Sequence, residues 1–153
     1  MKDAASLPTD LICPAEQIFD ESAVHDRILS ELADDTKDPT HVRAAAVRVL
    51  KSANAKGRAA IAEALSADPM SAQSATRSYC WLTDCLVRTV LTTALEHVHP
   101  LPTPTQNERI AVFAVGGYGR GEMAPESDVD LLFLTPYKIT PWAESLIETT
   151  LYI

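Results

Sequence analysis

The sequence predicts an α+β fold in which a helical region precedes a small αβ segment. Two long stretches, residues 40–67 and 71–97, carry apolar side chains three and four residues apart, which is the spacing of one helix face. Two short apolar runs, residues 110–115 and 131–134, have the pattern of strands and flank a glycine-rich turn. A proline-rich connector, residues 100–106, separates the helical pattern from the strand pattern.

The composition is that of an ordinary globular protein. Of the 153 residues, 46% are hydrophobic and 22% are charged. The net charge of −8 argues against a non-specific nucleic-acid surface, which needs clustered Lys and Arg. The sequence has no apolar run of about 18 residues and no signal-peptide pattern at its start. We therefore expect a cytoplasmic protein that binds neither nucleic acid nor membrane.

The N-terminal third predicts two helices after a loose arm. Residues 1–13 have no periodic pattern. Residues 14–35 are expected to form an amphipathic helix whose apolar positions are Ile18, Val24, Ile28 and Leu32. Pro39 suits the first turn of the next helix, over residues 40–67. Gly57 interrupts that helix at a cost of about 1 kcal/mol relative to alanine, and close helix packing is its simplest explanation.

The helix over residues 71–97 has an apolar stripe that includes Tyr79 and Leu82. His97 and His99 lie near its end, where a positive imidazole would interact favourably with the helix C-terminus. A metal role for these histidines would need a third ligand, which the nearby sequence does not offer. The three cysteines also lack a metal-binding spacing, so we expect reduced, structural thiols at Cys13, Cys80 and Cys85.

The connector suggests a division of the chain into four parts. These are an arm (1–13), a helical region (14–99), the connector (100–106) and an αβ part (107–153). The last segment, residues 141–153, reads as a helix that ends on apolar residues without a cap, with Glu144 and Glu148 on a solvated face. We therefore expect the N-terminal fragment of a longer protein, with an open sheet edge and an uncovered apolar face.

Four of the five glycines lie within six residues, at Gly116, Gly117, Gly119 and Gly121. Glycines allow a backbone to approach a bulky anion, and a helix N-terminus offers N–H groups to phosphate. Two common nucleotide motifs do not fit this stretch. A P-loop needs a lysine that is absent here, and the dinucleotide fingerprint needs another glycine spacing and an acidic residue where Tyr137 stands.

Asp128 and Asp130 open the second apolar run. In a strand they would project from the same face, with Val129 pointing into the core. Two carboxylates so close together favour a bound cation, and a phosphate-binding turn beside them is what Mg²⁺-dependent phosphoryl chemistry requires. The alternative is a pair of strand-end carboxylates that only face solvent.

Neighbouring polar residues have two interpretations each. Arg120 could contact a triphosphate or pair with Glu122 or Glu126. Ser127 could bind a phosphate oxygen or cap the turn before the strand. Tyr118 is expected to be packed rather than to stack on a base.

The spacing of these motifs resembles a known superfamily. An apolar residue, Gly-Gly, about ten residues and then Asp-apolar-Asp-apolar is similar to the signature of nucleotidyltransferases with the polymerase-β-like fold. The stretch GGYGRGEMAPESDVDLL also resembles the motif of the bifunctional uridylyltransferase/uridylyl-removing enzymes of bacterial nitrogen regulation. The helices LKSANAKGRAAIAEAL and SYCWLTDCLVRTV resemble the region before that family's catalytic domain. The likeness covers about residues 42–135 and is strongest over 115–134.

The resemblance implies a reaction and roles for residues. Asp128 and Asp130 match the family's metal-binding carboxylates, and Gly116 and Gly117 match its phosphate-binding turn. The implied reaction transfers UMP from UTP to a tyrosine of the PII signalling protein and releases pyrophosphate. Two Mg²⁺ ions about 3.5–4 Å apart would activate the attacking oxygen and stabilise the leaving one.

The sequence departs from the family pattern in one respect that matters for catalysis. The superfamily usually supplies a third carboxylate from a later strand, and no such strand follows Leu134. We expect the hydrolase domain and the glutamine-sensing domains of the family to lie outside this chain, so glutamine would act as an effector only through domains absent here. We expect weak nucleotide binding and negligible turnover by this chain alone.

Three alternatives remain open. They are an adenylyltransferase of the same superfamily, a nucleotide-binding regulatory module without catalysis, and a helical docking module with a vestigial αβ tail.

Overall fold

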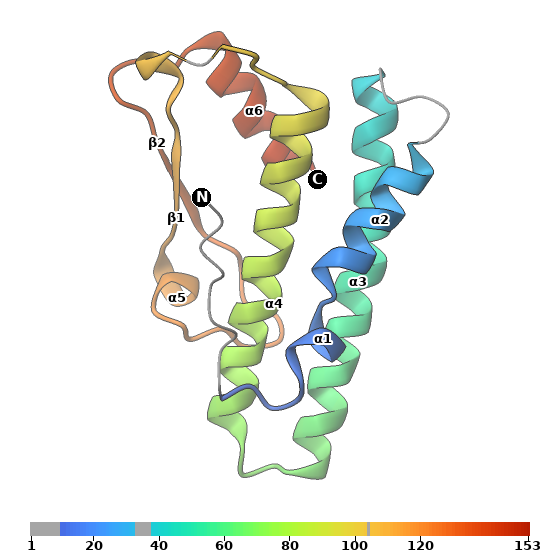
Figure 1. Ribbon diagram of the computed structural model, residues 1–153. Helices are drawn as coiled ribbons and strands as arrows, with labels where there is room; N and C mark the ends of the chain where they lie inside the picture. Colours follow the sequence, from blue (N-terminus) through green and yellow to red (C-terminus); the bar gives the residue numbers. More distant parts are fainter. Residues whose placement is uncertain (1–9, 33–37, 104) are drawn as a thin grey trace.

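The computed structural model describes residues 10–32, 38–103 and 105–153, and these form a helical region and a small two-stranded sheet (Figure 1). This arrangement is α+β, as predicted. The predictions for residues 1–9, 33–37 and Pro104 lie outside the described residues. The helical region consists of α1 (Ala15–Ile18), α2 (Glu21–Glu31), α3 (Pro39–Ala67) and α4 (Ala72–Thr93), which η1 (Ala94–Val98) continues as a π-helical turn. No helix in the described ranges is long and apolar enough to cross a membrane.

The long helices α3 and α4 lie side by side and run in opposite directions, and α1 and α2 pack along α3 (Figure 1). Their boundaries agree closely with the predicted helices, and Pro39 begins α3 as expected. The predicted apolar stripes supply most of the core. Its buried members include Ile18, Val24, Ile28, Leu32, Val42, Ala46, Val49, Leu50, Ile61, Tyr79, Leu82 and Val90.

The single helix predicted over residues 14–35 is wrong, because the chain breaks between α1 and α2. Phe19 is extended and buried, and Asp20 caps α2 by accepting a hydrogen bond from the backbone N–H of Ala23 at 3.0 Å. Aspartate favours this N-cap position because its carboxylate satisfies an N–H group that has no partner within the helix. Residues 10–13, which the sequence places in a loose arm, also contact α4, because the backbone N–H of Ile12 donates to Ser78 Oγ at 2.9 Å.

Gly57 lies where three helices approach closely, which confirms the packing explanation. A Cβ atom at this position would lie 2.5 Å from the carbonyl oxygen of Ile18 in α1. It would also lie 2.8 Å from Cδ1 of Leu82 in α4. A side chain at residue 57 would therefore push α1 and α4 away from α3.

At the end of α4 and η1, His99 does not have the positive imidazole that the sequence predicts. Burial and the nearby charge of Arg43 lower the pKa of His99, which favours its neutral form. The His99 ring lies 2.8 Å from Thr149 Oγ1, and Trp142 Nε1 donates to the His99 carbonyl oxygen at 3.0 Å. Both partners belong to α6 (Pro141–Tyr152), so polar contacts join the last helix to the end of the helical region.

The sheet consists of β1 (Ala111–Ala114) and β2 (Leu131–Leu134), which pair antiparallel with Ala111 opposite Leu134. A short 3₁₀ turn, η2 (Gln106–Glu108), precedes β1. One face of this sheet is apolar and exposed, as expected. Its members are Phe113 (50% exposed), Leu132 (45%) and Leu134 (48%).

Candidate functional site

The candidate site lies where the chain leaves β1 and enters β2. The glycine turn, α5 (Gly116–Gly119), follows β1 directly, and the acidic segment Asp128–Asp130 precedes β2. The backbone N–H of Val115 donates to the carbonyl oxygen of Asp130 at 3.1 Å, which extends the pairing of the two strands by one residue. The fold therefore brings the predicted glycine turn and the predicted acidic segment together.

Glycine is required at two positions of the turn. Gly116 has a φ of +61°, and a Cβ atom there would lie 2.4 Å from Oδ2 of Asp130. A Cβ atom at Gly119 would lie 2.4 Å from the carbonyl oxygen of Ala114. These distances are too short for a side chain, so the absence of Cβ atoms allows the Asp130 carboxylate to lie against the start of the turn. At Gly117 a Cβ atom would make only ordinary contacts, so packing does not explain that glycine.

Asp128 and Asp130 are both exposed, and they lie just outside the regular strand. The prediction that Val129 points into the core is wrong, because its side chain is 48% exposed. Val129 instead lines a cavity of about 160 Å³ between the acidic segment and helices α3 and α4. The segment crosses this cavity without close packing against the helices, and this explains the exposure of Val129.

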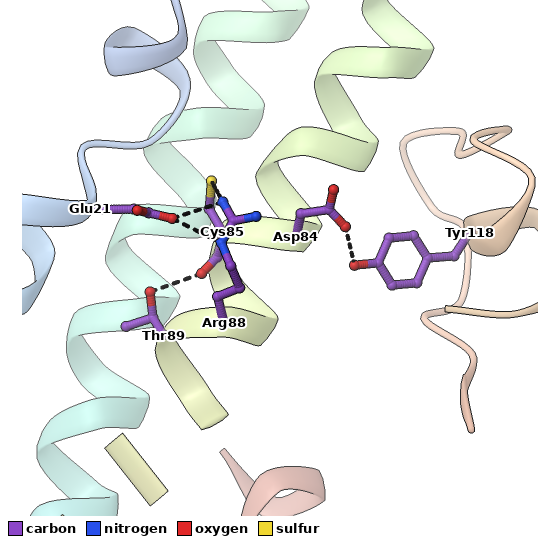
Figure 2. Close-up of polar contacts among 6 residues, drawn as sticks. All are labelled: Glu21, Asp84, Cys85, Arg88, Thr89 and Tyr118. Carbon is purple, nitrogen blue, oxygen red and sulfur yellow. Dashed lines mark hydrogen bonds and ion pairs between the residues drawn. The ribbon is translucent and has the colours of Figure 1, made fainter. Parts of the chain in front are cut away.

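Tyr118 docks the glycine turn onto α4, which confirms that it is packed. Its ring is buried, and its hydroxyl donates to Oδ1 of Asp84 at 2.6 Å (Figure 2). Burial and the hydrogen bond to Asp84 raise the pKa of Tyr118 well above its ordinary value, so the phenol remains neutral. Sequence reasoning missed Asp84, although a carboxylate within the largely apolar stretch CWLTDCLV was a signal of a specific partner.

On the other side of α4, a second group of polar contacts reaches α2 (Figure 2). Arg88 pairs with Glu21 at 2.8 Å and donates to Sγ of Cys85 at 3.2 Å. Burial raises the pKa of Cys85 to about 12, so its thiol stays protonated, and all three cysteines are free. Helix α4 thus connects the N-terminal helices with the glycine turn.

In the loop between the turn and the acidic segment, Arg120 and Ser127 make the local contacts that the sequence allowed as an alternative to phosphate binding. Arg120 Nε donates to Glu122 at 2.8 Å, and both side chains are exposed. Ser127 Oγ accepts from the backbone N–H of Ala124 at 2.8 Å and caps a turn. Binding of phosphate by Arg120 or Ser127 remains a prediction.

Arg58 of α3 also contacts this loop. It donates to the carbonyl oxygen of Pro125 and pairs with Glu126 at 2.6 Å. Sequence reasoning did not find Arg58, because its partners lie 67 and 68 positions away and no local pattern connects them.

The two aspartates are the residues that could hold a metal ion. Carboxylate oxygens suit Mg²⁺, which keeps several of its water ligands and is often bound by one or two carboxylates together with substrate phosphates. In the part of the chain that the structure describes, no group of three or more His, Cys, Asp or Glu side chains is placed to hold a metal. The pair therefore fits a Mg²⁺ ion shared with a phosphate-bearing substrate better than a closed structural metal site.

A glycine turn closed by a carboxylate, beside a second exposed aspartate, is the arrangement that the resemblance to nucleotidyltransferases implies. Comparison with known proteins supports the same class of protein. The family model for glutamate-ammonia ligase adenylyltransferase (GlnE) matches residues 8–148, and the chain belongs to this nucleotidyltransferase family.

The curated relatives carry a different name from the family model, bifunctional uridylyltransferase/uridylyl-removing enzyme. This name confirms the resemblance that the glycine and aspartate motif indicates. A bifunctional uridylyltransferase/uridylyl-removing enzyme of Ruegeria pomeroyi is 58% identical over 136 residues, which are 89% of this chain and 15% of the relative. The enzyme of that name from Cereibacter sphaeroides is 53% identical over 94% of this chain and 16% of the relative. One from Rhodopseudomonas palustris is 38% identical over 90% of this chain and 15% of the relative.

The chain therefore spans only about one sixth of the length of these relatives. No solved structure gives a significant match.

Proposed function

We propose that this chain provides the nucleotide-binding part of an enzyme that transfers UMP from UTP to a tyrosine of the PII signalling protein and releases pyrophosphate. The observation that carries the proposal is the approach of the Asp130 carboxylate to Gly116 at the start of the glycine turn. The proposal uses this approach because the first N–H groups of a helical turn have no partner within it and are free for a phosphate oxygen. The names of the curated relatives support uridylyl transfer.

Each part of the site has a chemical role in this proposal. The first N–H groups of the turn, at Gly116 and Gly117, would hold phosphate oxygens of the nucleotide. Asp128 and Asp130 would hold Mg²⁺, which when bound withdraws charge from the phosphate as a Lewis acid. Arg120 is exposed beside the turn and could exchange its partner Glu122 for a phosphate oxygen. In the reaction, the acceptor tyrosine hydroxyl gives up its proton to solvent and its oxygen bonds to the α-phosphorus. The bond from that phosphorus to the oxygen bridging the α- and β-phosphates breaks, and pyrophosphate leaves with that oxygen.

Adenylyl transfer is the second candidate, because the matching family model is that of an adenylyltransferase. The residues described here make phosphate and metal binding plausible on chemical grounds but do not contact a base. A regulatory module that binds nucleotide without catalysis is a third candidate, since a third carboxylate does not join the pair within the described residues. Regulation by glutamine and a cytoplasmic location are parts of the proposal that follow from the uridylyltransferase assignment.

The first test is Mg²⁺-dependent binding of UTP and ATP to this chain, measured by calorimetry. Asp128→Asn/Asp130→Asn is expected to abolish binding, because the amide oxygens and nitrogens no longer carry the charge that holds Mg²⁺. A matched control is Glu144→Gln/Glu148→Gln, which removes two exposed carboxylates of α6 and should leave binding unchanged.

Transfer is tested in a hybrid enzyme, in which this chain replaces the matching region of the Ruegeria pomeroyi relative. Labelled UMP should appear on PII in the hybrid and not in its double-asparagine variant. Label from ATP in place of UTP would establish the adenylyl alternative. Binding without transfer would establish the regulatory module. If both nucleotides bind weakly and equally well to the unsubstituted chain and to the double-asparagine variant, the proposal is contradicted.

A further inference from the structure

The acidic segment is held at its two ends. At one end, the carbonyl oxygen of Asp130 accepts from Val115 and joins the strand pairing. At the other end, residues 124–127 form a closed turn, in which the backbone N–H of Ser127 donates to Ala124 at 3.1 Å and Ser127 Oγ accepts from Ala124 at 2.8 Å. Asp128 and Val129 connect these two anchored points.

The middle of the segment has little support from apolar packing. A cavity of about 160 Å³ lies between it and the helices, with Val129 and Leu131 on one wall and Leu82, Leu86 and Val90 on the other. Val129 is 48% exposed, so much of its surface faces this open pocket and solvent instead of a packed neighbour. The position of Asp128 therefore depends on what holds the preceding turn.

Arg58 is the residue of α3 that holds this turn. Its guanidinium donates to the carbonyl oxygen of Pro125 in the middle of the turn and pairs with Glu126 at 2.6 Å. The guanidinium also lies 5.9 Å from the centre of the Tyr79 ring, which is buried on α4. The Glu126 side chain is 91% exposed, so its ion pair contributes little. Met123, just before the turn, is buried in the core, and the bond to the Pro125 carbonyl is the polar contact by which α3 holds the turn itself.

We propose that Arg58 is a positioning residue for the acidic segment. By holding the 124–127 turn on α3, Arg58 sets the place of Asp128 relative to Asp130 and to the glycine turn. This inference rests on the proposed function, because it assigns Arg58 a role toward the same nucleotide site. Two carboxylates that share one cation must keep a fixed spacing, and loss of an outer residue that orients metal ligands commonly costs about 10- to 100-fold in metal affinity or activity.

The test compares Arg58→Met and Arg58→Lys with a matched control on the same helix. Arg48→Met removes another exposed arginine of α3, which pairs with Glu31 at 2.8 Å, away from the loop. Hydrogen exchange of residues 123–130 is measured on this chain, and the Mg²⁺ concentration for half-maximal UMP transfer is measured on the hybrid enzyme. Arg58→Met should speed exchange in this segment and raise the Mg²⁺ requirement about 10-fold. Arg58→Lys should restore part of both, and Arg48→Met should change neither.

Several results would overturn the inference. One is an Arg58→Met variant that behaves like Arg48→Met in both measurements. Another is a loss of folded protein with an unchanged Mg²⁺ requirement, which would show a merely structural role. If Glu126→Gln changes hydrogen exchange and the Mg²⁺ requirement as much as Arg58→Met does, the ion pair holds the turn and the bond to the Pro125 carbonyl does not. If the unsubstituted hybrid shows no aspartate-dependent transfer, the proposed function fails and the inference fails with it. Normal transfer in both the unsubstituted hybrid and Arg58→Met overturns the inference alone.

Discussion

The helical region and the sheet of this molecule differ in how they use apolar side chains. In α1 to α4 the apolar stripes face one another, and residues such as Ile18, Ile61 and Leu82 are almost fully buried. In the sheet, Phe113 and Leu132 are about half exposed on a face that the described residues leave uncovered. The helical region therefore contains the apolar core, while the sheet presents the glycine turn and the carboxylates to solvent.

The two regions meet through the apolar packing of Tyr118, Met123 and Leu131 against the helical core and through a few polar contacts. Tyr118 bonds to Asp84 of α4, Arg58 of α3 bonds to the loop at Pro125, and His99 lies against Thr149 of α6. Directional contacts of this kind specify a relative position more than they add stability, since a typical hydrogen bond contributes about 1 kcal/mol. We infer that the helices act as the support on which the site is assembled.

The largest expected effect tests where the stability of the chain resides. Leu82→Ala should lower the free energy of unfolding by about 3 kcal/mol, because Leu82 is buried beside Gly57 and its truncation enlarges the adjacent cavity. Leu132→Ala should change it by less than about 0.5 kcal/mol, as expected for an exposed position. Urea unfolding of both variants measures the difference. Equal losses would show that the sheet face is covered in solution and would remove the contrast between the regions.

A second prediction concerns the site rather than the core. Gly116→Ala should weaken Mg²⁺-dependent UTP binding about 10- to 100-fold, because the new methyl group would displace the Asp130 carboxylate by roughly an ångström or more. Gly121→Ala is the matched control. Its φ of +72° imposes a similar backbone strain, but no atom lies within 4 Å of the added methyl group. Calorimetry should therefore find a much smaller loss for Gly121→Ala, and equal losses would attribute the effect to strain instead of the clash.

The same contrast explains which features were predictable from sequence. Helices over residues 40–67 and 71–97 were predicted well, because burial on one side imposes a repeat that a linear sequence records. The glycine turn and the acidic pair were predicted as a site because their residue types are restricted by chemistry, and the fold brings the two segments together. The break at Phe19 and Asp20 was missed, since the apolar repeat continues across it and hides the N-cap of α2.

The remaining features depend on distant parts of the chain. The exposure of Val129 follows from a cavity whose other wall is formed by α3 and α4, so alternation along the strand predicted the wrong environment. The contacts of Arg58 with Pro125 and of Asp84 with Tyr118 join helices to a loop far away in sequence. Only the three-dimensional arrangement shows that the helices reach the site.

The smallest expected effect is a loss of stability at high pH that comes from the buried Cys85 thiol of the helical region. Burial raises the pKa of Cys85 to about 12, whereas an unfolded thiol has a pKa of about 8.5. Above this lower value the unfolded chain loses a proton that the folded chain keeps, so stability is fully present below about pH 8 and falls as pH rises toward 12. Between pH 8 and pH 10 the protein should lose about 2 kcal/mol more than Cys85→Ala does, measured by urea unfolding. Taking this difference cancels the titration of Tyr118 and of the other groups common to both proteins. Identical losses would mean that the Cys85 thiol also ionises in the folded state, and the helical region would then be more open to water around α4 than its packing indicates.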